Sequence, residues 1–405
     1  MKAESEKQLL KAESSELEQS SIGLLALSSK LNIGFDGKRA TNNLTGLGNY
    51  SRSLIKLLAE KRPENRYLVY TPKVKSNLRI ASFVETKGLE VKTPKTSNFL
   101  WRSFGILKDL INDGVDLYHG LSQEIPFAIN HSKIKSVVTI HDLIFLRFPK
   151  YYKFLDRKIY TFKSKYACKN ANSIIAISEK TKADIVELYG IPEDKIKVIY
   201  QTCDDIFKTA STEEELELVS AKYKLPSSYL LNVGTIEERK NLLSLIRALP
   251  QLSQANKLVV IGKETSYKKL VLEEIKKLKL QKQVIFLKNV PFNDLPAIYQ
   301  LSKAFIYPSK YEGFGIPILE ALYSKTPVIA ATGSCLEEAG GPTSLYVHPD
   351  DDLALAKAIE TVLHSTALRN AMIEKGLLHA SKFNSEKITA DVMNTYLAVM
   401  QENLN

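Results

Sequence analysis

The order of apolar segments along the chain limits its fold more than any other feature. From Leu31 onward, short apolar runs of strand length alternate with longer segments whose apolar residues recur at helical spacing. Strands that are separated by helices pair in parallel and are covered on both faces. In the first half the predicted strands are 31–35, 67–70, 115–118, 136–140, 173–177 and 196–200, and the clearest predicted helix is 49–61.

The second half is more regular and predicts a second sheet of the same kind. Each helical segment there joins two apolar runs, as a right-handed βαβ crossover requires. The predicted strands are 229–233, 257–261, 283–287, 304–307, 327–331 and 344–347, and the predicted helices are 242–251, 267–280, 294–301 and 317–325. A long last helix is expected at 385–402.

Chain length and local composition divide the sequence into two α/β domains. A chain of 405 residues exceeds an ordinary single core, since domains commonly hold roughly 100–200 residues. The predicted parts are a polar tail at 1–30, an N-terminal domain at 31–205, an acidic linker at 206–226, a C-terminal domain at 227–383 and a last helix at 384–405 that packs back on the N-terminal domain.

Composition excludes several classes of protein. The apolar fraction of 44% and the charged fraction of 25% are those of a globular protein, not of a disordered or fibrous one. Cys168, Cys203 and Cys335 are odd in number and widely spaced, which favours neither a disulfide framework nor a zinc site. The apolar run at 22–27 is too short for export or membrane spanning. We therefore expect a cytoplasmic protein.

The positive charge is concentrated in one half of the chain. Residues 31–205 hold 29 basic and 18 acidic side chains, whereas residues 206–405 hold 23 and 22. This excess indicates an anionic partner of the first half, such as lipid head groups, a phosphorylated acceptor or nucleic acid. The alternative is a basic surface that is simply solvated.

Three loops of the second half carry residues suited to binding. Ligands of open α/β sheets lie at the carboxyl ends of the strands, where loops lead into helices. The first loop, 233–241, contains Gly234 and Thr235 and ends in Arg239 and Lys240, which would meet an anion together with free backbone N–H groups. A diphosphate fits that environment, although a chance Arg-Lys pair on a surface is common.

The second loop, 307–322, is the strongest signal. Gly313 and Gly315 leave the backbone open to a ligand, and Pro317 suits the start of a helix. Glu312 and Glu320 can accept hydrogen bonds from hydroxyl groups of a sugar and a ribose, or else merely complement a helix dipole and solvent. The third loop, 331–341, adds Glu338 as a weaker candidate.

These segments together resemble the retaining glycosyltransferases of the family-four group, and bacterial mannosyltransferases among them. Arg-Lys-Asn at 239–241 resembles the family's phosphate loop, and Glu312-Gly313-Phe314-Gly315 with Glu320 resembles its paired-glutamate signature. The resemblance implies an α/β protein of the GT-B fold, with two Rossmann-like domains facing across a crevice. It also implies that Arg239 and Lys240 hold the donor diphosphate, that Glu312 and the backbone at Phe314, Gly315 and Ile316 hold the sugar, and that Glu320 holds the ribose.

The first half is similar to the same family at three shorter segments, which are Thr45–Tyr50, Thr139–Asp142 and Ile177–Glu179. Thr45–Tyr50 resembles its first glycine loop, in which Gly46 and Gly48 would let a phosphate approach a helix start. Thr139–Asp142 resembles its His-Asp strand end, so His141 is expected in the site, where it could donate to a sugar hydroxyl or phosphate. Departures from the family pattern, such as Thr235 in place of a basic residue, leave the donor open.

The resemblance implies retaining transfer of a hexose without a metal or other cofactor. The donor would be a nucleotide diphosphate sugar, with GDP-mannose favoured, and the acceptor a glycan or lipid-linked molecule in cell-surface polysaccharide synthesis. The catalytic group would comprise His141, Arg239, Lys240 and Glu312. The alternative is a nucleotide-sugar-binding protein of the same fold without transferase activity. Nucleic-acid binding is not expected, because no reading motif accompanies the basic charge.

The segment Tyr151–Asn170 predicts peripheral contact with the inner face of the plasma membrane. Basic and aromatic residues alternate there, and this mixture suits an anionic interface. An ordinary helix with a solvated basic face is the alternative.

Overall fold

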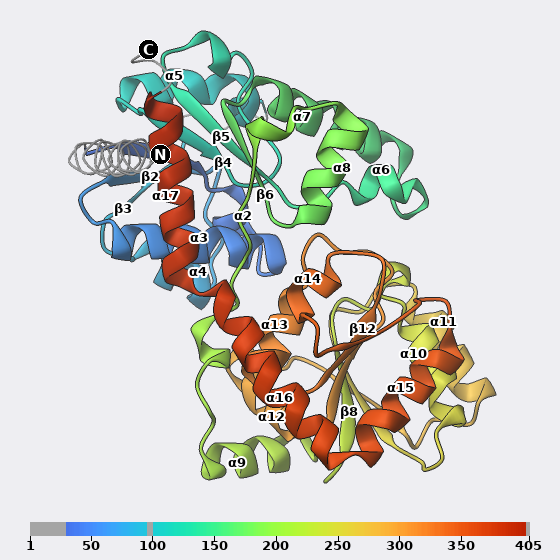
Figure 1. The fold of residues 1–405 in the computed structure, drawn as a ribbon. Helices are drawn as coiled ribbons and strands as arrows, with labels where there is room; N and C mark the ends of the chain where they lie inside the picture. The colour runs from blue at the N-terminus through green and yellow to red at the C-terminus, as the bar shows by residue number, and fades with distance from the viewer. Residues whose placement is uncertain (1–29, 95–99, 402–405) are drawn as a thin grey trace, which may run out of the picture. The chain divides into compact units, whose positions relative to one another are not determined.

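The computed structural model describes residues 30–94 and 100–401, so the predicted tail lies almost wholly outside the described residues. The described chain forms two compact units. One unit contains the residues up to Leu121, Ile125–Val137 and those from Val392 on, and the other contains Ser122–Glu124 and Val138–Asp391. The strands form one sheet of seven and one of six, with helices between them (Figure 1).

The seven-stranded sheet has the order β3-β2-β1-β4-β5-β6-β7. Its strands are β1 Asn32–Asp36, β2 Arg66–Tyr70, β3 Leu89–Lys92, β4 Leu117–Gly120, β5 Lys135–Ile140, β6 Ser173–Ala176 and β7 Ile196–Val198. β1 pairs in parallel with both β2 and β4, and β6 pairs in parallel with β7. β3 was not predicted, because this edge strand has only four residues and contains no continuous apolar run.

Helices connect these strands as the apolar spacing predicts. They are α2 Lys38–Asn42, α3 Gly46–Lys61, α4 Leu78–Val84, the π-helix η1 Trp101–Gly105, α5 Ile106–Asn112, α6 Ile144–Arg147, α7 Phe154–Asn170 and α8 Glu179–Tyr189. Short 3-10 turns are η2 Ile129–His131, η3 Pro149–Tyr151, η4 Glu193–Lys195 and η5 Asp205–Phe207.

The six-stranded sheet has the order β10-β9-β8-β11-β12-β13, and all its pairs are parallel. Its strands are β8 Tyr229–Val233, β9 Lys257–Ile261, β10 Val284–Leu287, β11 Ala304–Tyr307, β12 Val328–Ala331 and β13 Leu345–Val347. The predicted bounds of β8, β9 and β11 agree with the structure. The two parallel sheets with connecting helices confirm the α/β class.

Helices cover both faces of this sheet (Figure 1). They are α10 Leu242–Ala248, α11 Lys268–Lys277, α12 Leu295–Leu301, α13 Ile316–Tyr323, α14 Leu336–Gly340, α15 Asp352–His364 and α16 Thr366–Ala380, with short turns η6 Glu238–Lys240, η7 Leu249–Gln251, η8 Phe292–Asp294 and η9 Ser381–Phe383. α10 contacts α11 and α15 on one side, and α13 contacts α12, α14 and α16 on the other.

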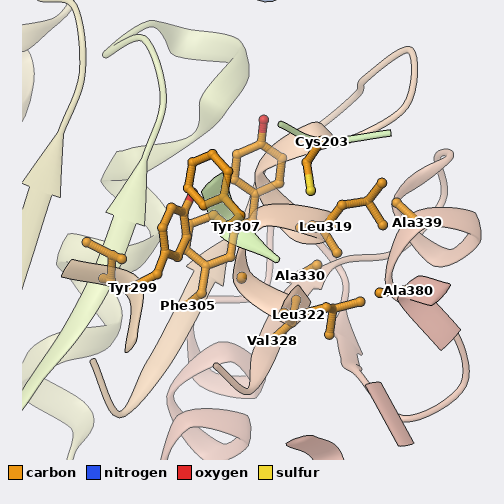
Figure 2. Close-up of a cluster of buried hydrophobic side chains, with 14 of the residues drawn as sticks. Cys203, Tyr299, Phe305, Tyr307, Leu319, Leu322, Val328, Ala330, Ala339 and Ala380 are labelled. Atoms are coloured by element: carbon orange, nitrogen blue, oxygen red, sulfur yellow. The ribbon is translucent and has the colours of Figure 1, made fainter. Parts of the chain in front are cut away.

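Alternate residues of the strands in the six-stranded sheet belong to two different buried clusters. In β11, Phe305 and Tyr307 belong to one buried cluster, and Ala304 and Ile306 belong to the other. This alternation follows from the twofold repeat of a strand, which points successive side chains to opposite faces. Figure 2 shows the first cluster, where the rings of Tyr299 and Tyr307 flank Phe305 with centroids 5.3 and 5.5 Å from it. The hydroxyl groups of these two tyrosines donate hydrogen bonds to Glu320 and Glu312.

Hydrogen bonds also hold the helix in the predicted linker and the last helix. α9, Glu213–Tyr223, lies in the predicted linker and begins with a capping box between Thr212 and Glu215. The last helix, α17 Ser385–Gln401, places the Tyr396 hydroxyl 2.6 Å from Nδ1 of His119 in β4. The predicted domain boundaries themselves stay a prediction.

Among the described residues, no helix combines the length and the apolar character that a membrane crossing would need.

Candidate functional site

The loop after β8 carries Arg239 and Lys240, and its backbone at Gly234 passes close to the backbone at Gly262. Gly234 has φ +155° in this loop, and a Cβ on Gly262 would lie 1.7 Å from the carbonyl oxygen of Gly234. Only glycine permits so close an approach. The loop then passes Thr235 and turns through η6, which carries Arg239 and Lys240. The predicted phosphate loop is thus one loop between a strand end and a helix.

Glu312 is the centre of a buried ionic cluster in the same unit. Its Oε1 lies 2.5 Å from Lys240 Nζ, 2.8 Å from Arg239 Nη1 and 2.5 Å from Ser309 Oγ. The hydroxyl of Tyr307 donates to the same oxygen at 3.2 Å. The structure therefore brings together three of the predicted catalytic residues, which are far apart in the sequence.

Electrostatics in this cluster favour an ionised Glu312. Burial opposes its ionisation, but the charges of Lys240 and Arg239 outweigh burial and lower the pKa of Glu312 to about 2. Burial lowers the pKa of Lys240, against the opposing effect of Glu312. For Arg239 the two carboxylates of Glu312 and Glu237 overcome burial and raise the pKa. Two cations thus share one buried carboxylate, and a second carboxylate, that of Glu237, pairs with Arg239 at 2.6 Å from a more exposed position.

The loop that follows Glu312 leads into α13 with unused backbone donors. Gly315 has φ +117° at the N-cap of α13, where Ile316 is the first residue and Pro317 the second. Among the described residues, the N–H groups of Phe314, Gly315 and Ile316 have no hydrogen-bond partner. Oriented N–H groups at a helix start attract oxygen atoms of a ligand. The side chain of Phe314, by contrast, is buried in the core.

Glu320 lies further along α13 in a different environment. Its Oε2 accepts a hydrogen bond of 3.0 Å from the hydroxyl of Tyr299. Burial raises the pKa of Glu320 to about 7, with the charge of Asp204 adding to the increase. Tyr299 and Tyr307, on either side of Phe305 in the core, thus each place a hydroxyl group on one of the two glutamates.

The raised pKa of Glu320 predicts how stability depends on pH. Between about 4.5 and about 7 the unfolded carboxyl ionises and the folded one does not, so the contribution of Glu320 to the free energy of unfolding falls by about 3 kcal/mol across that interval. Glu320→Gln does not titrate, so its stability relative to the wild type should rise with pH over the same interval. Urea unfolding at pH 5 and 7.5, with Glu273→Gln on the exposed face of α11 as control, measures this. An unchanged difference between the two pH values would contradict it.

His141 is buried at the end of β5 in the same unit. Its Nδ1 lies 3.2 Å from Nε2 of Gln201, and a hydrogen bond in which that amide nitrogen donates corresponds to the tautomer with the ring proton on Nε2. A Cβ on Gly313 would lie 2.1 Å from the carbonyl oxygen of His141. The backbones next to His141 and Glu312 are therefore in contact, and the role of His141 in a binding site stays a prediction.

The first glycine loop belongs to the other unit. Gly46 and Gly48 lie in the first turn of α3. A Cβ on Gly48 would lie 1.9 Å from the carbonyl oxygen of Asn43, whereas one on Gly46 would meet open space. Gly48 thus allows a close backbone contact, and the predicted phosphate-binding role of both glycines stays a prediction.

Glu338 has a structural partner that the sequence analysis did not foresee. Its two carboxylate oxygens accept hydrogen bonds from the N–H groups of Glu179, at 2.7 Å, and Lys180, at 3.0 Å. These are the first residues of α8, so the carboxylate caps that helix and complements its dipole. A role of Glu338 in donor binding stays a prediction, and it would compete with this cap.

Three further residues shape the site although no role was predicted for them. The hydroxyl of Ser309 donates a hydrogen bond to Glu312. A serine three residues before a glutamate is the sequence feature that could have indicated this contact. Asn241, at φ +58°, donates to the carbonyl groups of Pro308 at 3.1 Å and Pro349 at 2.6 Å and so joins two loops. Cys335 contacts the Glu312 loop, and no signal in the sequence indicated this contact.

No group of three or more His, Cys, Asp and Glu side chains in the described part of the chain is arranged to hold a metal ion. The chemistry that the cluster offers is binding of an anion by Arg239, Lys240 and backbone N–H groups beside a carboxylate that can accept hydrogen bonds from hydroxyl groups.

Comparisons with known proteins cover both halves of the chain. Residues 217–379 match the family model "Glycosyl transferases group 1", and residues 44–205 match "Glycosyltransferase Family 4". O-antigen chain mannosyltransferase B of Escherichia coli is 28% identical over 380 residues, which cover 87% of this chain and 96% of that protein. O-antigen chain mannosyltransferase RfbU of Salmonella typhimurium is 30% identical over 225 residues, which cover 56% of this chain and 60% of that protein.

A solved structure with the same fold is that of Anabaena Alr3699/HepE in complex with UDP and glucose. It superposes with a TM-score of 0.73 at 18% identity and covers 91% of this chain and 100% of that one. At this identity the likeness concerns the fold, and it confirms the predicted GT-B architecture.

Proposed function

The chain belongs to the glycosyltransferases of group 1 and family 4, and on that basis we propose that it transfers a hexose, with retention of configuration and without a metal ion, from a nucleotide diphosphate sugar to a glycan or lipid-linked acceptor. The observation that carries this proposal is the pair Arg239 and Lys240 on the buried carboxylate of Glu312, beside unused N–H groups at the start of α13. GDP-mannose is the proposed donor, because the two relatives described above are named as mannosyltransferases.

The proposed reaction uses these residues as follows. The bond between the anomeric carbon and the diphosphate breaks, a bond from the acceptor oxygen forms on the same face, and the acceptor proton passes to the departing phosphate oxygen. Arg239 and Lys240 stabilise the charge that develops on the diphosphate. Glu312 and the N–H groups of Phe314, Gly315 and Ile316 orient the hexose.

The remaining residues complete the proposed donor site. Glu320 accepts from ribose hydroxyls, and its loss affects donor KM more than kcat, because those contacts change little during reaction. His141 donates from Nε2 to the hexose or the phosphate. Gly234 and Thr235 lie beside the diphosphate. The charge of the diphosphate is met by two cations and backbone N–H groups, and this supports the proposed independence from metal.

Transfer in the presence of EDTA tests the proposal. GDP-mannose and UDP-glucose are incubated with a polyprenyl-diphosphate-linked mannoside, and release of GDP or UDP and extension of the acceptor are measured. We expect extension with GDP-mannose that EDTA does not abolish. A donor that raises Tm without any transfer would favour the alternative, a nucleotide-sugar-binding protein, and recovery of transfer only on addition of magnesium would overturn metal independence.

The surface of α7 supports a second part of the proposal, a cytoplasmic enzyme that binds peripherally at the inner face of the plasma membrane in cell-surface polysaccharide synthesis. Ser164, Ala167 and Cys168 form the buried face of this helix. The large apolar residues point outward instead, with exposed fractions of 72% for Leu155 and 62% for Phe162.

Basic side chains share this outward face. Lys158, Lys165 and Lys169 are exposed and follow Leu155 at intervals of three, ten and fourteen residues, which place them on one side of a helix. Large apolar groups among lysines match a bilayer interface with anionic head groups. This feature favours the predicted membrane contact over a solvated basic face, and it needs no nucleic-acid partner.

Neutralising these lysines should weaken binding to anionic vesicles. Each lysine contributes about 1 kcal/mol near such a surface, so Lys158, Lys165 and Lys169 changed together to Gln should lower the affinity about a hundredfold. Co-sedimentation with vesicles of phosphatidylglycerol and phosphatidylethanolamine measures the effect. The matched control changes Lys269, Lys276 and Lys277, all exposed on α11, to Gln. Equal loss in both triple variants would show that only net charge matters and would refute a membrane role for α7.

A further inference from the structure

We propose that Cys335 is a positioning residue that holds the backbone of Glu312, Gly313 and Phe314 in the conformation needed for donor binding. The inference rests on the proposed function, because it assigns a task to the backbone around the residues that orient the hexose. It concerns a thiol that the proposed mechanism does not otherwise use.

Cys335 reaches the Glu312 loop from a neighbouring strand end. It lies between β12 and α14 and is fully buried. Its Sγ lies 3.1 Å from the carbonyl oxygen of Glu312 and 3.1 Å from that of Phe314. A thiol has one proton, so the two carbonyl groups share a single donor.

The carbonyl group between these two is held from another direction. The hydroxyl of Ser178, at the N-cap of α8, donates to the carbonyl oxygen of Gly313 at 2.7 Å. All three acceptors of the segment Glu312–Phe314 therefore have side-chain partners. The backbone N–H groups of Phe314 and of the next two residues, Gly315 and Ile316, have no partner among the described residues. The carbonyl groups are therefore occupied, and these N–H donors are not.

This arrangement determines which end of each peptide group is available to a ligand. A peptide group whose carbonyl oxygen is fixed by a donor has its N–H direction fixed as well, because the group is planar. Fixed N–H groups cost no reorganisation when a hexose oxygen arrives. Gly315, at φ +117°, could otherwise adopt many conformations, so restraint from outside the loop is needed.

The protonation of Cys335 fits a donor and not a nucleophile. Burial raises the pKa of this thiol well above its usual range, and the nearby carboxylates of Glu312 and Glu338 raise it further. The thiol consequently stays protonated at neutral pH and can donate to the carbonyl groups. A thiolate, the reactive form of cysteine, is disfavoured here.

Two substitutions of Cys335 distinguish the effect of losing the hydrogen-bond donor from the effect of changing the side-chain volume. Cys335→Ser keeps a donor at the position, whereas Cys335→Ala removes it and leaves two carbonyl groups unpartnered. Cys168→Ala is the matched control, because Cys168 is equally buried and its side chain lies on the inner face of α7, away from the outward face that carries the lysines. Tm for each variant shows that it folds.

Transfer kinetics with GDP-mannose and the polyprenyl-diphosphate-linked mannoside form the first measurement. We expect Cys335→Ala to lower kcat about tenfold relative to Cys168→Ala at similar Tm, and Cys335→Ser to stay within about threefold of the wild type. Equal kcat and donor KM in Cys335→Ala and Cys168→Ala would overturn the inference. Absence of transfer by the wild type would instead count against the proposed function.

Amide hydrogen exchange of the segment 312–318 without substrate is the second measurement, and it does not depend on activity. Faster exchange in Cys335→Ala than in Cys335→Ser and Cys168→Ala supports the inference. The same exchange rates in all three variants would overturn it, whatever the enzyme transfers.

Discussion

Lys240→Ala is expected to lower kcat by about 100- to 1000-fold with the donor that the wild type uses. The ammonium group of Lys240 lies 2.5 Å from Glu312 Oε1 and belongs to the cationic pair that we place at the diphosphate. Negative charge on the diphosphate increases as the glycosidic bond breaks, so this contact strengthens in the transition state and its loss reduces turnover more than donor affinity. Steady-state kinetics with GDP-mannose give kcat and KM separately.

The control for Lys240→Ala is Lys310→Ala. Lys310 lies in the Glu312 loop and pairs with Asp350 at the surface, so this variant removes a nearby positive charge outside the cluster. Its kcat should stay close to that of the wild type. Wild-type kcat in Lys240→Ala, with Tm confirming a folded protein, would show that the loop after β8 is not the phosphate loop.

Glu312→Gln is expected to reduce both stability and turnover. The substitution keeps the size of the side chain but leaves Arg239 and Lys240 without their shared anion, which costs about 3–5 kcal/mol for a buried pair that loses one partner. In the proposed donor complex, a nucleoside diphosphate supplies negative charge beside Arg239 and Lys240. Addition of GDP should therefore raise Tm by more in Glu312→Gln than in the wild type, while kcat falls because the hexose is no longer oriented.

The lowered pKa of Glu312 also predicts how the stability lost in Glu312→Gln depends on pH. Its folded pKa of about 2 lies below the ordinary value of 4.5, so ionised Glu312 contributes stability above pH 4.5 that is lost as pH falls toward 2. Glu312→Gln should show no such loss, so its stability approaches that of the wild type at low pH. Glu273→Gln is the control, because Glu273 lies on the exposed face of α11, outside the cluster. Identical acid unfolding of wild type and Glu312→Gln would contradict the assignment.

Much of the fold was predictable because apolar periodicity is a local property. β8, β9 and β11 have the predicted bounds, since continuous apolar runs of that length are typical of strands buried on both faces. β3 was missed for the converse reason: half of its residues are polar, and only pairing with β2 makes the segment a strand. Periodicity reports burial, and an edge strand is only half buried.

Local sequence also indicated where binding residues would lie, but not how they interact. The positions of Arg239, Lys240 and Glu312 after strands predict that they meet at one edge of the sheet, because parallel strands end at the same edge. Glu338 illustrates the limit of this reasoning. It lies in a comparable loop, yet its carboxylate caps α8, and no local pattern distinguishes a helix cap from a ligand contact.

The sequence by itself therefore determined the α/β class, the order of the strands along the chain and the loops that carry charged residues, because these depend on neighbours within a few positions. Only the tertiary structure decided that Glu312 is ionised among two cations whereas Glu320 has a pKa of about 7. It also decided that Cys335 contacts the Glu312 loop. These properties arise from groups that are distant in sequence and close in space, since burial and charge act through distance and not through chain position.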